Sequence, residues 1–162
     1  MNAAMHPATH LQPMTVASLD ALMPIELAAY AFPWTRGNFI DSLAAGYAAE
    51  VLTDERGHVL GYFLAMAGVD EMHLLNITVA PAVQGRGFGR YLLDRVVQRA
   101  HALRAAVLWL EVRASNTGAR ALYERYGFVQ AGVRRGYYPA AQGSREDAVV
   151  MRLSLVPEGN ER

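Results

Sequence analysis

The segment Gln84–Gly89, with the sequence QGRGFG, constrains the fold of this chain more than any other feature. It follows a strand-like run, Glu71–Val79, and opens a segment from Gly87 to about Leu103 whose apolar residues recur at helical spacing. Glycine tolerates positive φ angles and allows close backbone approach. The first turn of a helix presents N–H groups without intrahelical partners at the positive end of the dipole. This strand–loop–helix order predicts an anion site suited to phosphate, with a tight turn and close helix packing as the alternative.

Two common phosphate-binding motifs do not fit this loop. The spacing of Gly85, Gly87 and Gly89 differs from the G-x-G-x-x-G dinucleotide fingerprint, and no acidic ribose partner follows at the expected distance. A P-loop requires a lysine, whereas all fifteen basic residues of this chain are arginines. Nicotinamide cofactors and nucleoside triphosphates are therefore disfavoured.

The composition narrows the class of protein further. A chain of 162 residues suits one domain, 1–162, with a core over about 9–155 and frayed ends at 1–7 and 157–162. Fifteen basic residues balance fifteen acidic ones, so no net field favours nucleic acid or a membrane as a partner. The absence of cysteine excludes disulfides, thiolate metal sites and a cysteine nucleophile. No signal peptide or membrane-length apolar run is visible, and we expect a soluble, cytoplasmic monomer.

The hydrophobic patterning predicts a mixed α/β fold. Three hairpin-linked strands followed by a strand–helix–strand crossover imply parallel and antiparallel pairs in one sheet. Helices are predicted to begin at Ser18, Thr35, Gly87 and Asn116, and a loop is predicted over Gly136–Glu146. Ala106–Arg113 is expected to be buried on both faces. The predicted strands are Thr9–Met14, Tyr47–Thr53, Val59–Ala67, Glu71–Val79, Ala106–Arg113, Phe128–Arg134 and Ala148–Leu155.

The stretch Asn76–Arg90, NITVAPAVQGRGFGR, resembles the acetyl-CoA motif of the GNAT acetyltransferases, written Q/R-x-x-G-x-G/A. The order of predicted elements also matches the GNAT fold. The resemblance implies acetyl-CoA as co-substrate and no metal. In that family the strand before the loop is bulged and pairs with the pantetheine arm, a role that would fall to Ile77, Thr78 and Val79. The loop residues that the resemblance assigns to the coenzyme are Gln84, Gly85, Arg86, Gly87, Phe88, Gly89 and Arg90.

Two side chains beyond the loop are candidates for proton transfer. Glu111 is a carboxylate late in a strand-like run of Val, Leu and Trp, and such surroundings suit a general base. A solvated strand end, with Glu111 paired to Arg113 or Arg120, is an equally good interpretation. Tyr123 lies on the apolar side of the next predicted helix, where an ordinary core aromatic is the simpler interpretation.

A narrower resemblance favours the catalytic interpretation of both residues. Leu110–Asn116, LEVRASN, and Ala121–Phe128, ALYERYGF, resemble the RimI-type branch of the family, the ribosomal-protein alanine N-acetyltransferases. The resemblance implies that Glu111 accepts the amine proton and that Tyr123 protonates the leaving thiolate. Asn116 matches an asparagine that hydrogen-bonds coenzyme A, and it also fits a plain helix cap.

The same branch suggests two walls for the acceptor site. Arg134–Pro139, RRGYYP, matches a hairpin that makes Tyr137 and Tyr138 candidate peptide contacts, with an exposed tip and aromatic packing as the alternative. The loop that contains Tyr30 and Trp34 would form the opposite wall, although Trp34 also suits the core. The histidines show no metal-ligand spacing and are assigned packing or solvent roles; they are His6, His10, His58, His73 and His101.

These resemblances imply transfer of acetyl from acetyl-CoA to the N-terminal alanine of the eighteenth small-subunit ribosomal protein. Two alternatives remain open. The acceptor is a lysine side chain or a small amine, or the chain is a non-catalytic acyl-CoA-binding module that acts through a protein partner.

Overall fold

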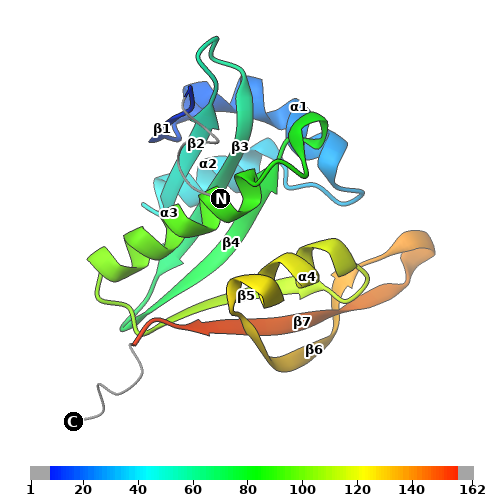
Figure 1. The fold of residues 1–162 in the computed structure, drawn as a ribbon. Helices are drawn as coiled ribbons and strands as arrows, with labels where there is room; N and C mark the ends of the chain where they lie inside the picture. The colour runs from blue at the N-terminus through cyan, green and yellow to red at the C-terminus, as the bar shows by residue number, and fades with distance from the viewer. Residues whose placement is uncertain (1–7, 157–162) are drawn as a thin grey trace. The chain divides into compact units, whose positions relative to one another are not determined.

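The structure is a computed structural model that describes residues 8–156, so the two terminal segments expected to fray lie outside the described residues. The described chain contains seven strands and four α-helices, with the hydrogen-bonded strand order β1-β2-β3-β4-β5-β7-β6 (Figure 1). This confirms the predicted α/β class and the predicted order of elements. The chain divides into two compact units, residues 8–65 with 76–94 and residues 66–75 with 95–156. The single domain expected from the length stays a prediction.

The first unit is built on antiparallel pairing of β1, β2 and β3. β1 is His10–Pro13, β2 is Ala48–Thr53 and β3 is Val59–Ala67. Between β1 and β2 lie the helices α1, Leu19–Ala29, and α2, Arg36–Ala44. As the sequence predicts, Thr35 caps α2, since its hydroxyl accepts a hydrogen bond from the Asn38 amide at 3.1 Å.

The core of this unit forms where alternate residues of the strands meet the apolar stripes of the two helices. Its buried members are Met14, Leu19, Leu22, Phe39, Ala49, Val51, Tyr62 and Leu64. Gly61 of β3 has no room for a side chain, because a Cβ there would lie 2.6 Å from the Thr78 carbonyl oxygen. This glycine therefore permits close approach of β3 to the end of β4.

β4, Glu71–Val79, and α3, Phe88–Ala102, flank the glycine loop. Alternate residues of β4 are buried, and the last two of these, Asn76 and Thr78, are polar. The first turn of α3 begins one residue later than predicted. Its buried face carries the predicted apolar residues Leu92, Leu93, Val96 and Ala100.

The second unit holds β5, Val107–Arg113, which runs parallel to β4 from Glu71↔Val107 to Leu74↔Leu110. On its other side β5 pairs antiparallel with β7, Arg145–Ser154, and β7 pairs with β6, Val129–Pro139. Helix α4, Thr117–Tyr126, connects β5 to β6 and is coloured yellow in Figure 1. Gly127 ends this helix at φ 124°, a positive φ of the kind that favours glycine at a helix C-terminus.

Two expectations for this unit were wrong. β5 is buried on one face only, since its burial alternates and leaves Trp109, Glu111 and Arg113 half-buried on the other face. The predicted loop Gly136–Glu146 is largely strand, and the chain reverses within Ala141–Gly143. Gly136, at φ 58°, lies within a shift of register against β7 between Arg134 and Tyr138, so the strand continues past the glycine instead of ending there.

Candidate active site

The glycine loop has the backbone geometry that an anion cradle requires. Gly85 and Gly87 adopt φ +77° and +86°, a region that other residues rarely occupy. A Cβ on Gly85 would meet nothing within 4 Å, so the demand for glycine there is conformational and not steric. The Tyr91 amide donates to the Gly87 carbonyl at 3.1 Å, which opens the hydrogen-bond ladder of α3 directly after the loop. The backbone donors of a helix start and the exposed guanidinium groups of Arg86 and Arg90 suit a pyrophosphate.

The loop is also tied to the strand before it. Gln84 Nε2 donates to the Val79 carbonyl oxygen at 3.2 Å. The Ala80 amide donates to the Leu60 carbonyl oxygen at 2.8 Å, which fixes the end of β4 against β3. The polar side chain that begins the predicted motif therefore holds the loop against the strand expected to carry the pantetheine arm.

Tyr30, a candidate for the acceptor wall, contacts the end of β4 through its hydroxyl. The hydroxyl oxygen lies 3.1 Å from the Ile77 carbonyl oxygen and 2.7 Å from Thr78 Oγ1. Burial, with a smaller contribution from the Glu26 charge, raises the pKa of Tyr30 to about 12, so the phenol is neutral at physiological pH. Because its hydroxyl is engaged by the strand, Tyr30 offers an acceptor chiefly its ring.

Glu26 is a functional candidate that the sequence reasoning missed. Its side chain is 1% exposed and accepts three hydrogen bonds: from the Tyr62 hydroxyl at 2.7 Å, from Asn76 Nδ2 at 3.2 Å and from the Trp34 amide at 2.9 Å. The Asn76 side chain continues this network, since Thr78 Oγ1 donates to its Oδ1 at 2.7 Å. One carboxylate thus joins α1, the loop before α2, β3 and β4.

A signal for Glu26 was present in the sequence. Glu26 follows Leu19 by seven positions and Leu22 by four, which places a carboxylate on the apolar stripe of α1.

Trp34, in the loop between α1 and α2, packs against Phe39, with ring centroids 5.1 Å apart, and borders the core of the first unit. The core role considered for Trp34 is therefore present, and its role as a peptide contact remains a prediction.

In the second unit Glu111 lies on the half-buried face of β5, and its partner is His73 of β4. His73 Nε2 lies 3.0 Å from Glu111 Oε1 and 2.8 Å from Oε2. His73 is in register with Trp109, two residues before Glu111, so all three side chains share one face of the strand pair. The Glu111 side chain is 9% exposed and that of His73 is 25% exposed.

The arginines proposed as alternative partners of Glu111 make other contacts. Arg113 Nη1 donates to the Pro139 carbonyl oxygen at 2.8 Å and to Glu146 Oε1 at 3.1 Å. Arg120 Nη1 donates to the Ala114 carbonyl oxygen at 2.9 Å. Because the Glu111 side chain is only 9% exposed, it is not a solvated strand end. His73, for which a packing or solvent role was expected, contacts its carboxylate.

The two tyrosines of the predicted peptide wall lie on β6 with their rings edge to face, centroids 5.0 Å apart. The Arg113 guanidinium lies 4.6 Å from the centre of the Tyr138 ring, and that of Arg134 lies 5.1 Å from the centre of the Tyr137 ring. Burial raises the pKa of Tyr138 to about 12, and the nearby charge of Glu111 adds to the effect. Tyr138 is thus a neutral phenol close to the candidate base.

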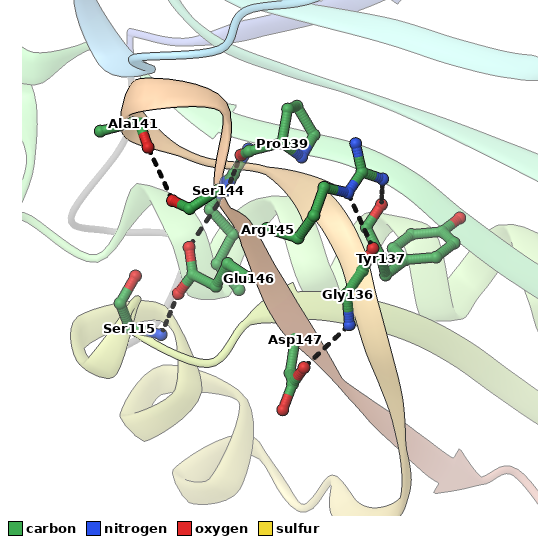
Figure 2. Close-up of polar contacts among 10 residues, drawn as sticks. Ser115, Gly136, Tyr137, Pro139, Ala141, Ser144, Arg145, Glu146 and Asp147 are labelled. Carbon is green, nitrogen blue, oxygen red and sulfur yellow. Dashed lines mark hydrogen bonds and ion pairs between the residues drawn. The ribbon is translucent and has the colours of Figure 1, made fainter.

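Figure 2 shows how side chains of β7 fix the irregular part of β6. Asp147 accepts a hydrogen bond from the Gly136 amide at 2.8 Å, and Arg145 donates to the carbonyl oxygens of Gly136 and Tyr137, each at 3.0 Å. Glu146 accepts from the Ser115 amide at 2.7 Å. Hydrogen bonds from Ser115, and then the Arg113 contact, lower the pKa of Glu146.

Tyr123 and Asn116 both lie on α4 or at its start. Tyr123 is 8% exposed, and its ring lies 5.7 Å from that of Phe128. Asn116 Oδ1 accepts from the Ala119 amide at 3.2 Å, so Asn116 does cap the helix. That bond uses the side-chain oxygen of Asn116, while the side-chain NH2 group is a separate donor that could serve a ligand.

Two further findings concern the described residues as a whole. Between residues 8 and 156, no group of three or more His, Asp or Glu side chains is arranged to hold a metal ion. None of the helices in that range is both long enough and apolar enough to cross a membrane.

The model of the acetyltransferase (GNAT) family matches residues 19–128. This span contains the glycine loop, Glu111 and Tyr123, and it covers more than half of the chain. The chain belongs to the GNAT family and is an acetyltransferase, as the resemblance of its motifs predicts.

Relatives place the chain within the family. It is similar to the [ribosomal protein bS18]-alanine N-acetyltransferase of Salmonella typhimurium, with 41% identity over 143 residues that span 88% of this chain and 95% of the relative. The crystal structure of the ribosomal-protein-S18-alanine N-acetyltransferase from Escherichia coli superposes with a TM-score of 0.84 at 38% identity, covering 95% of this chain and 98% of that one. These similarities confirm the RimI-type resemblance.

A third comparison concerns the co-substrate. The Salmonella typhimurium protein yncA, solved with its cofactor acetyl-CoA, shares the fold with a TM-score of 0.75 at 21% identity, over 94% of this chain and 96% of that one.

Proposed function

We propose that this chain transfers the acetyl group of acetyl-CoA to the N-terminal α-amine of a protein, and that the acceptor is the N-terminal alanine of ribosomal protein bS18. The observation that carries the proposal is the 41% identity, over 88% of the chain, to an enzyme named for that reaction. A ribosomal acceptor is consistent with a monomer that works in the cytoplasm.

For the donor, the glycine loop supplies the chemistry that coenzyme A needs. The backbone of Gln84–Gly89 and the start of α3 would hold the pyrophosphate, with Arg86 and Arg90 adding charge. The strand end at Ile77, Thr78 and Val79 would pair with the pantetheine arm. Asn116 would add a hydrogen bond through the side-chain amide that its capping bond does not use.

For the acceptor, the first requirement is a neutral amine. An α-ammonium group has a pKa of about 8, so holding it deprotonated at pH 7 costs about 1.4 kcal/mol, whereas a lysine at about 10.4 costs about 4.6 kcal/mol. In the proposed mechanism Glu111 takes this proton, directly or through a water, and becomes a neutral acid. The α-amine is thus the less demanding acceptor for a single carboxylate.

Bond exchange then completes the transfer. The amine lone pair attacks the thioester carbon, an N–C bond forms, and the C–S bond breaks with its electrons leaving on sulfur. In the proposal Tyr123 gives its phenolic proton to that sulfur. The acylated nitrogen then loses its second proton to solvent, which reprotonates Tyr123, and the proton held by Glu111 is released to solvent. The proposed peptide contacts are the rings of Tyr30, Trp34, Tyr137 and Tyr138.

The test is release of free thiol from acetyl-CoA in the presence of a hexapeptide with the bS18 N-terminus. We expect turnover by the parent enzyme, and loss of about 100-fold or more in kcat for Glu111→Gln, which keeps the size and polarity of the side chain but not its basicity. An N-acetylated copy of the same peptide is the matched negative control.

Other outcomes would redirect the assignment. Turnover only with an internal-lysine peptide or a small amine would replace the proposed acceptor. Tight binding of acetyl-CoA without turnover of any amine would leave a binding module that acts through a partner. Equal rates for the parent and Glu111→Gln would remove Glu111 from the mechanism.

A further inference from the structure

We propose that His73 is a positioning residue for the general base, holding the carboxylate of Glu111 in the orientation that accepts the amine proton. The inference rests on the proposed function, because it assumes that Glu111 is the base. It assigns a role to a histidine that forms no recognisable sequence motif.

The contact is built into the sheet. β4 and β5 are parallel and in register, with His73 opposite Trp109, and Glu111 follows Trp109 by two residues on the same face. His73 therefore reaches Glu111 along the diagonal of the strand pair, and its Nε2 lies within 3.0 Å of both carboxylate oxygens. β5 is also paired on its other side, where Glu111 is in register with Val150 of β7. The backbone of β5 at Glu111 is therefore held between two neighbouring strands.

Burial strengthens the hydrogen bond between His73 and Glu111. The Glu111 side chain is 9% exposed, so few water molecules compete with the imidazole for its oxygens. A hydrogen bond to an ionised acceptor is about twice as strong as a neutral one. In the proposal Nε2 carries the hydrogen and directs it between the two oxygens. This contact stops rotation of the carboxylate about its last bond and leaves the outer lone pairs for the incoming proton.

In this role His73 neither gains nor loses a proton. The proton passes from the amine to a carboxylate oxygen of Glu111, and the imidazole keeps its Nε2–H throughout. Tyr138 of β6 lies near the Glu111 charge, and its phenol stays neutral. Arg113 of β5 lies over the Tyr138 ring and donates a hydrogen bond to Glu146 of β7.

Two substitutions show whether His73 acts as a hydrogen-bond donor or only through packing. His73→Leu removes the donor, whereas His73→Gln places an amide nitrogen close to the position of Nε2. We expect His73→Leu to lower kcat by about 10-fold or more with KM for acetyl-CoA within about 2-fold of the parent, and His73→Gln to recover most of the loss. His101→Leu, at an exposed histidine in the last turn of α3, is the matched control and should behave as the parent.

A double-mutant cycle makes the test specific to Glu111. In a Glu111→Gln background, His73→Leu should cause no further loss of kcat, because the group that it positions is already gone. Thermal melting of each variant reports folding separately. The proposal is overturned if His73→Leu keeps the parent kcat, if His73→Gln is as slow as His73→Leu, or if the loss is equally large in the Glu111→Gln background.

Failure of the proposed function gives a different pattern. If the parent acetylates another amine and not the peptide, the acceptor assignment fails, while the same variants compared on that amine decide the role of His73. If the parent acetylates no amine, both proposals are overturned.

Discussion

The Tyr62 hydroxyl donates a 2.7 Å hydrogen bond to Glu26 Oε1 inside the core of the first unit, where the two residues are 0% and 1% exposed. Burial, and then the bond to Glu26, raise the pKa of Tyr62 well above its usual range. A buried carboxylate is tolerated only when donors surround it, and here these donors come from β3, β4 and the loop before α2. The contact therefore links the hydrophobic core to segments expected to bind both substrates.

Tyr62→Phe is predicted to lower the free energy of unfolding by about 1–3 kcal/mol, because it leaves a buried charge short of one donor. Urea unfolding followed by circular dichroism measures this change. Tyr47→Phe, at a half-buried tyrosine, is the control and should change stability by less than about 0.5 kcal/mol. Equal effects of the two substitutions would show that the bond to Glu26 adds nothing.

The stability of the protein is predicted to fall in alkaline solution through Tyr30. Its pKa is about 12 in the folded protein and about 10 when unfolded, so its contribution is complete below pH 10 and is lost as the pH rises towards 12. The chain has no lysine, so no ε-amine titrates in this window. Unfolding free energies measured from pH 9 to 12 should therefore decline less steeply in Tyr30→Phe than in the parent. Parallel curves would contradict the prediction.

Gly87→Ala is predicted to weaken acetyl-CoA binding by about 10-fold or more, since a side chain at φ +86° strains the loop by about 1–2 kcal/mol and obstructs the approach of the pyrophosphate. Isothermal titration calorimetry gives the affinity. Gly57→Ala is a matched control, because Gly57 lies in a hairpin turn at φ +85° with open space around it. Both variants should lose similar stability, and only Gly87→Ala should lose affinity.

Tyr123→Phe is predicted to lower kcat by about 10²-fold and to leave acetyl-CoA affinity within about 2-fold of the parent, because the phenol acts on the departing sulfur. Steady-state kinetics and calorimetry separate the two quantities. Tyr126→Phe, one turn further along α4, removes a hydroxyl that has no role in the proposed mechanism and should keep the parent rate. Loss of binding in Tyr123→Phe would make Tyr123 a structural residue.

Much of the fold followed from local signals in the sequence. The helix starts at Thr35 and Asn116 and the strand Glu71–Val79 each depend on neighbours within a few positions, and each is present in the structure. The hairpin of β6 and β7 was predicted less well. A loop was predicted over Gly136–Glu146, whereas pairing with β7 and the hydrogen bond from the Gly136 amide to Asp147 hold most of the segment extended.

The environment of the candidate base could not be predicted in this way. His73 and Glu111 are 38 residues apart, and only the parallel register of two strands brings them together. No spacing rule relates a histidine on one strand to a carboxylate on a strand that follows a helix. Glu26 differs, since a carboxylate on the apolar stripe of α1 was visible in the sequence and was passed over.

The irregular course of β6 has a consequence for the behaviour of the protein at high concentration. β6 is an outer strand of the sheet, and its exposed face includes Val129 and Val133, which would suit growth of the sheet by a second chain. Its register is broken twice, and the exposed Arg134 and Arg135 follow Val133 directly. A neighbouring molecule that paired with β6 would find its backbone hydrogen-bonding groups out of register, next to two positive charges. The irregular strand that carries the proposed peptide contacts Tyr137 and Tyr138 is therefore also expected to disfavour aggregation at this edge of the sheet.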